Sequence, residues 1–468
     1  MAKKKKNSDK IGKIETILLF IISGIFTLLI VFLNIIPSKY LYIIIGVIVL
    51  IFLIFLVSLK KKKNKKAKVF AFLYILILLF SSYYLFSTVD LLSYFKGKSY
   101  KEERYIIYVL KSSNFNSIND LNNKTIGYVN DSKKALDSLV KSINIEKKSY
   151  SDISLLANDL LKENIFSILL KDAEYDLICE MIPEFSNLTK AISEKTIKEE
   201  IKIDTNKKDI TKEAFNVYLS GIDTYGSVNK SSRSDVNIIA TINPKTHKIL
   251  LTSIPRDYYV KLNGDSTKMD KLTHAGIYGV TSSMKTIESL LNTEINYYVK
   301  VNFSSVIKIV DTLNGIDVNS NYSFTSMDNY TYKKGINHLD GKKTLSFVRE
   351  RHAFDSLGGD RVRGENQQIV LKALLNKATS PEILTKYTSL LKNIKNSFTT
   401  NLTDDDITSF IKMQLDTNPK WEVLTYNLNG SNYYAKTYSY SLHKLYVMLP
   451  DEKTVKEAED KIKLLLTN

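Results

Sequence analysis

Three long apolar runs near the N-terminus constrain this chain more than any other feature. They cover Thr16–Ile36, Leu41–Leu59 and Val69–Val89, and none of them contains a charged side chain. A helix needs about 20 apolar residues to cross the hydrocarbon layer of a bilayer. The first run is too long for the apolar core of a signal peptide, and no A-x-A-like cleavage site follows it. We therefore expect a transmembrane region over residues 1–92, with three helices at 16–36, 41–59 and 69–89.

The formal net charge of +17 first suggests a nucleic-acid or anionic lipid partner. However, residues 1–14 hold six lysines against Asp9, and residues 60–68 hold seven more, so most of the charge flanks the apolar runs. Positively charged flanks stay in the cytoplasm, which places everything after about residue 90 outside the cell. We expect a multi-pass protein of the cell membrane with an extracellular C-terminal domain and no nucleic-acid partner.

The chain has one cysteine, Cys179, which cannot form an internal disulfide and is expected to pack as a small apolar side chain. An exported protein without disulfides suits a bacterium of the Gram-positive type, whose surface lacks an oxidising compartment.

The exported part divides into two α/β segments. Residues 104–201 are expected to form a small accessory domain, with strands in RYIIYVLK and TIGYVN and helices over Lys133–Ile143 and Ile153–Leu161. The segment YDLICEMI fits a buried strand or a helix. This order of elements resembles half of a periplasmic solute-binding domain. No side chains stand out as ligands, so a structural role is favoured over a binding role.

Residues 213–450 are expected to form a second, larger α/β domain around a central mixed sheet. Apolar, β-rich strands are predicted over Phe215–Gly221, Val236–Thr241 and Lys248–Ser253. Further strands and helices follow, with the predicted helices at Met284–Leu291, Ser304–Leu313, Glu365–Lys377 and Thr403–Leu415.

Polar and charged residues follow or precede these strands in five groups, which indicates an active face built from strand ends. The groups are Asp223; Arg233 with Asp235; Arg256 with Asp257; Lys271 with His274; and Arg349, Arg351, Arg363 and Gln367. Carboxylates hold hard cations such as Mg²⁺, and arginine forks grip phosphate oxygens, so the set predicts a magnesium–polyphosphate site. Taken singly, each has a plainer interpretation: a turn-forming Asp, a surface ion pair or a structural histidine.

The densest group lies in TLSFVRERHAFDSLGGDRVRGENQQ, residues 344–368. Arg349 and Arg351 are two residues apart, so in a strand both would point to one face. The pair Gly358 and Gly359 would then permit a tight turn. A solvated basic loop is the alternative interpretation.

Together, several long motifs resemble those of the LytR–CpsA–Psr family over about residues 215–380. They are RSD at 233–235, IIATINPKTHKILLTSIPRD at 238–257, KLTHAGIYG at 271–279, LNGIDV at 313–318, GINHLDGKKTLSFVRER at 335–351 and D-x-x-R-x-x-N-Q-Q at 360–368. The resemblance implies a magnesium- (or manganese-) dependent phosphotransferase. Such an enzyme moves an anionic glycopolymer (teichoic acid, capsular or secondary wall polysaccharide) from a polyprenyl-pyrophosphate carrier to peptidoglycan.

The resemblance also assigns roles to residues. Asp223 and Asp235 match the metal-binding acids, and the expected catalytic residues are Asp235, Arg256, Asp257, Arg349 and Arg351. The expected pyrophosphate-binding residues are Arg233, Arg256, Lys271, Arg349, Arg351, Arg363 and Gln367. The polyprenyl tail would occupy an apolar tunnel, for which Val301, Phe303, Ile307 and Ile309 are candidates, although core packing explains them equally well.

The chain departs from the family pattern at three places. Val236 stands where the family commonly has Thr, and Asn366 stands where it has Arg, which removes a cation. Ala353–Gly359 is longer than is typical, so the position of Asp360 is uncertain, and Arg361 has no counterpart.

Two other functions remain open from the sequence. One is a membrane-anchored envelope sensor or transcriptional attenuator, although no helix-turn-helix or kinase-like pattern occurs. The other is a hydrolase of the polyprenyl pyrophosphate, in which water replaces the sugar at the same site. The general base is also open, with Asp257 or a metal-bound acid as the candidates.

Overall fold

The computed structural model describes residues 2–33, 38–60, 65–92, 99–201, 205–225, 227–357, 359–380, 390, 393–394 and 397–467. The chain divides into two compact units. The first comprises residues 1–96, 379–392 and 402–420, and the second comprises residues 97–378, 393–401 and 421–468.

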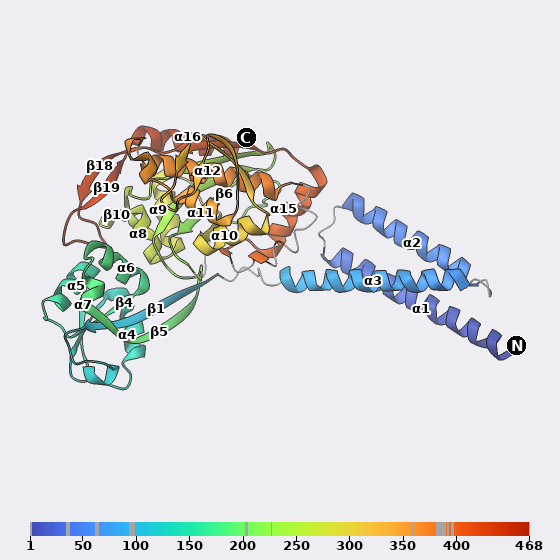
Figure 1. The fold of residues 1–468 in the computed structure, drawn as a ribbon, viewed down its shortest axis with the longest axis horizontal. Coiled ribbons are helices and arrows are strands. Elements are labelled where there is room, and N and C mark those ends of the chain that lie inside the picture. Colours follow the sequence, from blue (N-terminus) through green and yellow to red (C-terminus); the bar gives the residue numbers. More distant parts are fainter. Residues whose placement is uncertain are drawn as a thin grey trace. The chain divides into compact units, whose positions relative to one another are not determined.

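The first unit contains the three long N-terminal helices (Figure 1). They are α1 (Ala2–Leu33), α2 (Ser38–Lys60) and α3 (Lys65–Leu92), and each is long and apolar enough to cross a membrane. Large apolar side chains point outward along all three, as lipid contact requires. The predicted spans fall within these helices, except that residues 34–36 of the first span lie outside the described residues. The same unit contains α15 (Asp404–Thr417), which is capped by Thr403.

The accessory segment forms a five-stranded sheet in the order β3-β2-β4-β1-β5. The strands are β1 (Ser99–Leu110), β2 (Thr125–Val129), β3 (Glu146–Tyr150), β4 (Ser167–Lys171) and β5 (Thr189–Ile201). The helices are α4 (Lys133–Leu139), α5 (Ile153–Leu161), α6 (Asp172–Met181) and α7 (Phe185–Leu188). The ambiguous segment YDLICEMI is therefore mostly helical, within α6, where Cys179 packs half-buried against an apolar cluster.

The second domain is built on a six-stranded mixed sheet in the order β16-β11-β6-β7-β8-β17, which confirms the predicted fold class. The strands are β6 (Phe215–Ile222), β7 (Ser234–Asn243), β8 (Lys248–Ser253), β11 (Tyr297–Asn302), β16 (Phe398–Thr400) and β17 (Glu422–Asn427). The helices are α8 (Leu272–Ala275), α9 (Val280–Leu291), α10 (Phe303–Thr312), α11 (Gly341–Arg349), α12 (Gly359–Ala378) and α16 (Glu452–Thr467).

Four two-stranded ribbons complete this domain. They are β9 (Tyr259–Lys261) with β10 (Met269–Lys271), β12 (Ile316–Ser320) with β15 (Gly335–Leu339), β13 (Phe324–Thr325) with β14 (Thr331–Tyr332), and β18 (Gly430–Ala435) with β19 (Leu445–Pro450).

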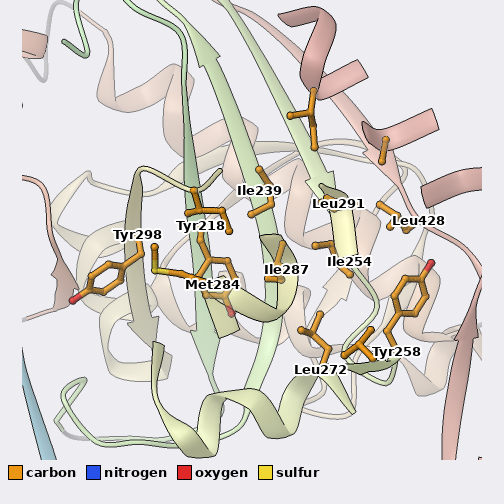
Figure 2. Packing of buried hydrophobic residues seen from close by; sticks show 14 of the residues in the cluster. Tyr218, Ile239, Ile254, Tyr258, Leu272, Met284, Ile287, Leu291, Tyr298 and Leu428 are labelled. Carbon is orange, nitrogen blue, oxygen red and sulfur yellow. The ribbon is translucent and has the colours of Figure 1, made fainter. Parts of the chain in front are cut away.

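The core of the domain lies between the sheet and two helices, α9 and α16 (Figure 2). Met284, Ile287 and Leu291 recur along one face of α9 and pack against Tyr218 of β6 and Ile239 of β7. Burying side chains of this size contributes about 1.5–3 kcal/mol each. This packing fixes the sheet on which the polar residues are mounted.

The directions of the strands determine where those polar residues lie. β6 is parallel to β11 and β8 is parallel to β17, whereas β7 runs antiparallel to both β6 and β8. The carboxyl ends of β6, β8, β11 and β17 therefore lie beside the first residues of β7. We call this row of strand ends the active edge.

Candidate active site

The active edge collects the charged residues that flank the three central strands. Asp223 follows the last residue of β6, and Asp235 is the second residue of β7. Ile222 and Ser234 are partners in the register of these strands, so the two acids begin from neighbouring positions. Arg256 and Asp257 follow β8 on the other side of β7.

Arg256 links two of these acids. Its Nη1 donates to Asp235 Oδ1 at 2.6 Å, and its Nε lies 3.5 Å from Asp257 Oδ2. Lys271 Nζ donates to Asp257 Oδ1 at 2.9 Å, which extends the chain of charges. Burial would raise the pKa of Asp257, but Lys271 and Arg256 outweigh it and hold that pKa below its usual range. A carboxylate held ionised by two cations is a weak base, so Asp257 is better suited to positioning Arg256 than to deprotonating an acceptor.

Asp223 and Asp235 are close enough to repel each other. Partial burial raises the pKa of Asp223, and the Asp235 carboxylate raises it further against the pull of Arg349, Arg256 and Arg363. Asp235 Oδ2 is buried and has no hydrogen-bond partner among the described residues. A cation between the two acids would relieve both conditions, so the pair fits Mg²⁺ or Mn²⁺.

The remaining ligands of such an ion would have to come from elsewhere. No group of three or more His, Cys, Asp or Glu side chains with metal-binding geometry occurs in the described part of the chain. Mg²⁺ commonly binds one or two protein carboxylates and completes its shell with water and substrate phosphates. The site is consistent with an ion that arrives together with a phosphate-bearing substrate.

The arginines of the 344–368 segment do not lie in a strand, so the two-residue spacing of Arg349 and Arg351 does not place them on one strand face. Arg349 is the last residue of α11, whose N-cap Asp340 accepts a hydrogen bond from the backbone NH of Lys343 at 2.8 Å. The helix packs tightly on α10, because a Cβ on Gly341 would lie 2.4 Å from the carbonyl oxygen of Ile307. Gly358, part of the predicted turn, lies outside the described residues, and Gly359 begins α12.

Arg349 still reaches the active edge from its helix end. Its guanidinium lies 4.4 Å from the centroid of the Phe303 ring, at the start of α10. Arg351 follows in the loop, where its Nε lies 3.4 Å from His352 Nε2. Among the described residues, no carboxylate lies within ion-pair distance of either arginine, which leaves both available for an anion.

Arg363 lies in the first turns of α12, and the guanidinium groups of Arg256 and Arg351 lie near it. Its Nη2 lies 3.1 Å from Asp360 Oδ1, and its side chain is only 13% exposed. Burial lowers the pKa of Arg363, and the positive charges of Arg256 and Arg351 lower it further. The guanidinium groups of Arg256, Arg351 and Arg363 thus lie close enough to repel one another, as expected for a polyanion site.

Three predicted site residues are not part of this cluster. Arg233 pairs with Glu180 of α6, in the accessory domain. Gln367 Nε2 lies 3.5 Å from the carbonyl oxygen of Val348, so it joins α12 to α11. His274 is buried, and its Nδ1 lies 2.6 Å from Asp270 Oδ1, which supports the structural interpretation of this histidine.

The structure adds two residues to the site. Thr273 Oγ1 donates to Asp235 Oδ1 at 3.4 Å. The Phe303 ring, a candidate for the lining of the apolar tunnel, makes a cation–π contact with the guanidinium of Arg349. The sequence signal for Thr273 is its place in KLTHAGIYG, next to the candidate His274. Asn366, where the family pattern has Arg, is buried and lies 3.4 Å from the carbonyl oxygen of Phe347. It therefore faces the protein interior.

The chain has a mixed α/β fold in which several arginines gather beside two carboxylates at the active edge. A family model described as "LytR_cpsA_psr family" matches residues 182–456, and the chain belongs to that family. A second model, described as "NMT1/THI5 like", matches residues 97–166 of the accessory segment.

Curated relatives are similar to slightly less than half of this chain. The polyisoprenyl-teichoic acid–peptidoglycan teichoic acid transferase TagU of Bacillus subtilis is 37% identical over 215 residues, which are 46% of this chain and 67% of the relative. The TagU of Enterococcus faecalis is 38% identical over 42% of this chain and 64% of its own length. The crystal structure of B. subtilis TagV has a TM-score of 0.46 at 26% identity, covering 55% of this chain and 98% of that one.

Proposed function

We propose that this protein transfers an anionic glycopolymer from a polyprenyl-pyrophosphate carrier to peptidoglycan. The observation that carries the proposal is the convergence of Arg256, Arg349, Arg351 and Arg363 on the acids Asp223 and Asp235 at one sheet edge. The names of the TagU relatives, which specify a polyisoprenyl-linked teichoic acid donor and a peptidoglycan acceptor, support the same substrates.

The reaction breaks a phosphoanhydride bond. An acceptor hydroxyl oxygen attacks the phosphorus that carries the polymer, and polyprenyl phosphate leaves with the electron pair of the broken P–O bond. The hydroxyl proton passes to a base or to water. Phosphoryl transfer of this kind requires positioning and charge neutralisation more than covalent catalysis.

Each residue then has a physical task. Arg349, Arg351 and Arg363 bind the diphosphate oxygens, and Arg256 stabilises charge that develops on the leaving phosphate. Asp257 and Lys271 hold Arg256 in place. Asp223 and Asp235 would hold Mg²⁺ or Mn²⁺, which when bound supplies further neutralisation of the phosphate oxygens.

The apolar helices anchor the protein in the membrane. The lysines that flank them favour a cytoplasmic N-terminus and an extracellular second domain, where a lipid-linked donor and wall glycan are both accessible. A reporter enzyme fused to the C-terminus and active only in the cytoplasm would contradict this orientation.

The reaction is tested with the full chain in detergent, polyprenyl-pyrophosphate-linked polymer and soluble peptidoglycan strands. We expect polymer to appear on the glycan, and Asp235→Ala to abolish this transfer. Asp265→Ala, in the exposed turn between β9 and β10, is the matched control and should behave as the wild type. Release of polyprenyl phosphate without any polymer on the glycan would identify a hydrolase instead.

A further inference from the structure

A second polar feature lies beside the active edge, in a groove of about 530 Å³ formed by β12, α12 and β17. The charged residues of the active edge do not account for this groove. Amides, hydroxyls and carboxylates dominate its lining, and Lys372 is the one cation among its lining residues in the described part of the chain.

Each wall of the groove follows the side-chain period of its element. Along β12, burial alternates, so that Asp317 and Asn319 project outward from one face while Val318 between them is buried. On β17, Thr425 and Asn427 likewise share a face. The groove is therefore a product of the strand registers and not of a single irregular loop.

The helical wall is set by the 3.6-residue period of α12. Glu365, Gln368, Lys372 and Asn376 fall on one face of the helix and all line the groove. Gln368 is buried and fixes the helix, because its Nε2 donates to the carbonyl oxygens of Leu251 at 3.1 Å and Tyr426 at 3.0 Å. The helix is thus held at a defined position over the carboxyl ends of β8 and β17.

The groove opens next to the diphosphate site. Asn427, the last residue of β17, is the register partner of Ser253, the last residue of β8. Gly364 of α12 lies against the same serine, since a Cβ there would be 3.4 Å from Ser253 Oγ. Arg363, on one side of Gly364, belongs to the diphosphate site, and Glu365, on the other side, belongs to the groove.

The chemistry of the lining suits an uncharged sugar chain better than a polyanion. Sugar hydroxyls and acetamido groups both donate and accept hydrogen bonds, as do the amides of Asn319, Asn321 and Asn427. Asn427 Oδ1 is buried without a hydrogen-bond partner among the described residues, a cost that a ligand donor would remove. Glu365 pairs with Arg361, and Asp317 Oδ1 lies 2.7 Å from His338 Nδ1. With Lys372 as the one cation among the described lining residues, the groove has no excess of positive charge to attract an anionic polymer, whereas the active edge gathers several arginines.

We infer that this groove binds the acceptor, a neutral N-acetylated glycan strand, and leads its hydroxyl to the diphosphate. The inference rests on the proposed function for the identity of the reaction, but the groove and its binding chemistry stand on the lining alone.

The test uses tetra-N-acetylchitotetraose as the probe and calorimetry on the full chain in detergent. Asn319→Leu places an apolar side chain at an exposed position of β12, where it should not affect folding. We expect it to weaken binding about tenfold, since it removes one or two hydrogen bonds and narrows the groove. Asn187→Leu, at an exposed position of α7 in the accessory domain, is the matched control and should leave binding unchanged.

Kinetics provide the second measurement. Asn319→Leu should raise the KM for the glycan acceptor about tenfold and leave the KM for the lipid-linked donor unchanged. A rise in the donor KM instead would overturn the inference by making the groove a polymer site, and so would wild-type binding of the probe by Asn319→Leu. The two proposals fail separately: the probe should still bind an Asp235→Ala protein that transfers nothing, whereas an active enzyme with no groove binding would refute only the groove.

Discussion

The accessory sheet and the central sheet both gather charge at the carboxyl ends of their parallel strands, but they treat that charge differently. In the accessory domain, Lys171 at the end of β4 is buried and pairs with Asp131 at 2.5 Å and Glu174 at 3.4 Å. Asp152, after β3, accepts hydrogen bonds from the backbone of Ser154 and from Ser441. At the active edge, by contrast, Arg349 and Arg351 have no carboxylate partner among the described residues, and the pKa of Arg363 is lowered.

This difference separates structural charge from functional charge. Burial would lower the pKa of Lys171, but Glu174 and Asp131 outweigh it and raise that pKa, so the cation is stabilised within the fold. For Arg363, burial and the charges of Arg256 and Arg351 outweigh the acids Asp360 and Asp235, so its pKa is lowered instead. A cluster that its own domain neutralises contributes to stability, whereas one left with excess charge is suited to a ligand.

The largest effect should follow loss of the arginine shared by Asp235 and Asp257. Arg256→Ala is expected to lower transfer about 10³-fold, or about 4 kcal/mol, because it removes a fixed donor to the developing phosphate charge. Transfer rates on folded protein measure this. Lys248→Ala, at the opposite end of β8 and paired with Glu422 at the surface, is the control and should retain full activity. A loss below tenfold for Arg256→Ala would exclude it from the reaction.

The corresponding change in the accessory domain should affect stability instead of chemistry. Lys171→Met leaves Glu174 buried without its cation, which is expected to destabilise the domain by about 3 kcal/mol. Hydrogen exchange of the amides of β1 and β4 measures this locally. Lys147→Met breaks an exposed pair with Asp137 and should cost under about 0.5 kcal/mol. If Lys171→Met reduced transfer by folded protein, the accessory domain would have a role in the reaction.

An intermediate effect is expected at the most crowded cation. Arg363→Ala should lower transfer about 10²-fold. It should leave the melting temperature unchanged or slightly higher, since it removes repulsion with Arg256 and Arg351. Lys377→Ala, in the last turn of the same helix, should change neither quantity. A large drop in melting temperature would mean that Arg363 is structural, like Lys171, and the distinction between the two edges would fail.

Much of this comparison could be predicted from the sequence because it depends on local patterns. The segment KILLTS is β8 and the predicted helix over Ile153–Leu161 is α5 without any shift. The strand is a short apolar run, and the helix has an amphipathic period and an N-cap at Asp152. For Asp223, Arg256 and Asp257, which do follow strands, position in the sequence is enough to predict a shared end of the sheet. Their roles in catalysis remain predictions.

The features that were missed depend on contacts between distant segments. The sequence FVRER allows Arg349 and Arg351 to lie in a strand, but the Asp340 cap and the close approach of Gly341 to α10 favour a helix. The pairing of Arg233 with Glu180 requires the accessory domain to lie against the second domain, which no motif encodes. The family pattern predicts a lost phosphate contact at Asn366, whereas the phase of α12 turns this side chain inward.

The smallest expected effect is a pH dependence of stability, and it distinguishes two acids of the active edge, Asp223 and Asp257. Asp223 has a raised pKa, so the folded state binds more protons than the unfolded state just above the ordinary Asp pKa of about 3.9, and stability falls as pH rises through that window. Asp257 has a lowered pKa, so its contribution to stability is present above about pH 3.9 and is lost on acidification. The two acids therefore change the free energy of unfolding in opposite directions as the pH rises.

Asp223→Asn should accordingly raise the melting temperature at pH 7. The gain in stability should stay under about 1 kcal/mol because Asp223 is only partly buried and water screens its charge, and the gain should vanish near pH 4. Asp257→Asn should lower the melting temperature at pH 7. Thermal melts of the full chain in detergent measure both. Since the cost of ionised Asp223 comes partly from Asp235, millimolar Mg²⁺ should stabilise the wild type and not Asp223→Asn. Equal stabilisation of both proteins by Mg²⁺ would place the cation elsewhere, and a destabilised Asp223→Asn would make this acid a structural partner of the arginines.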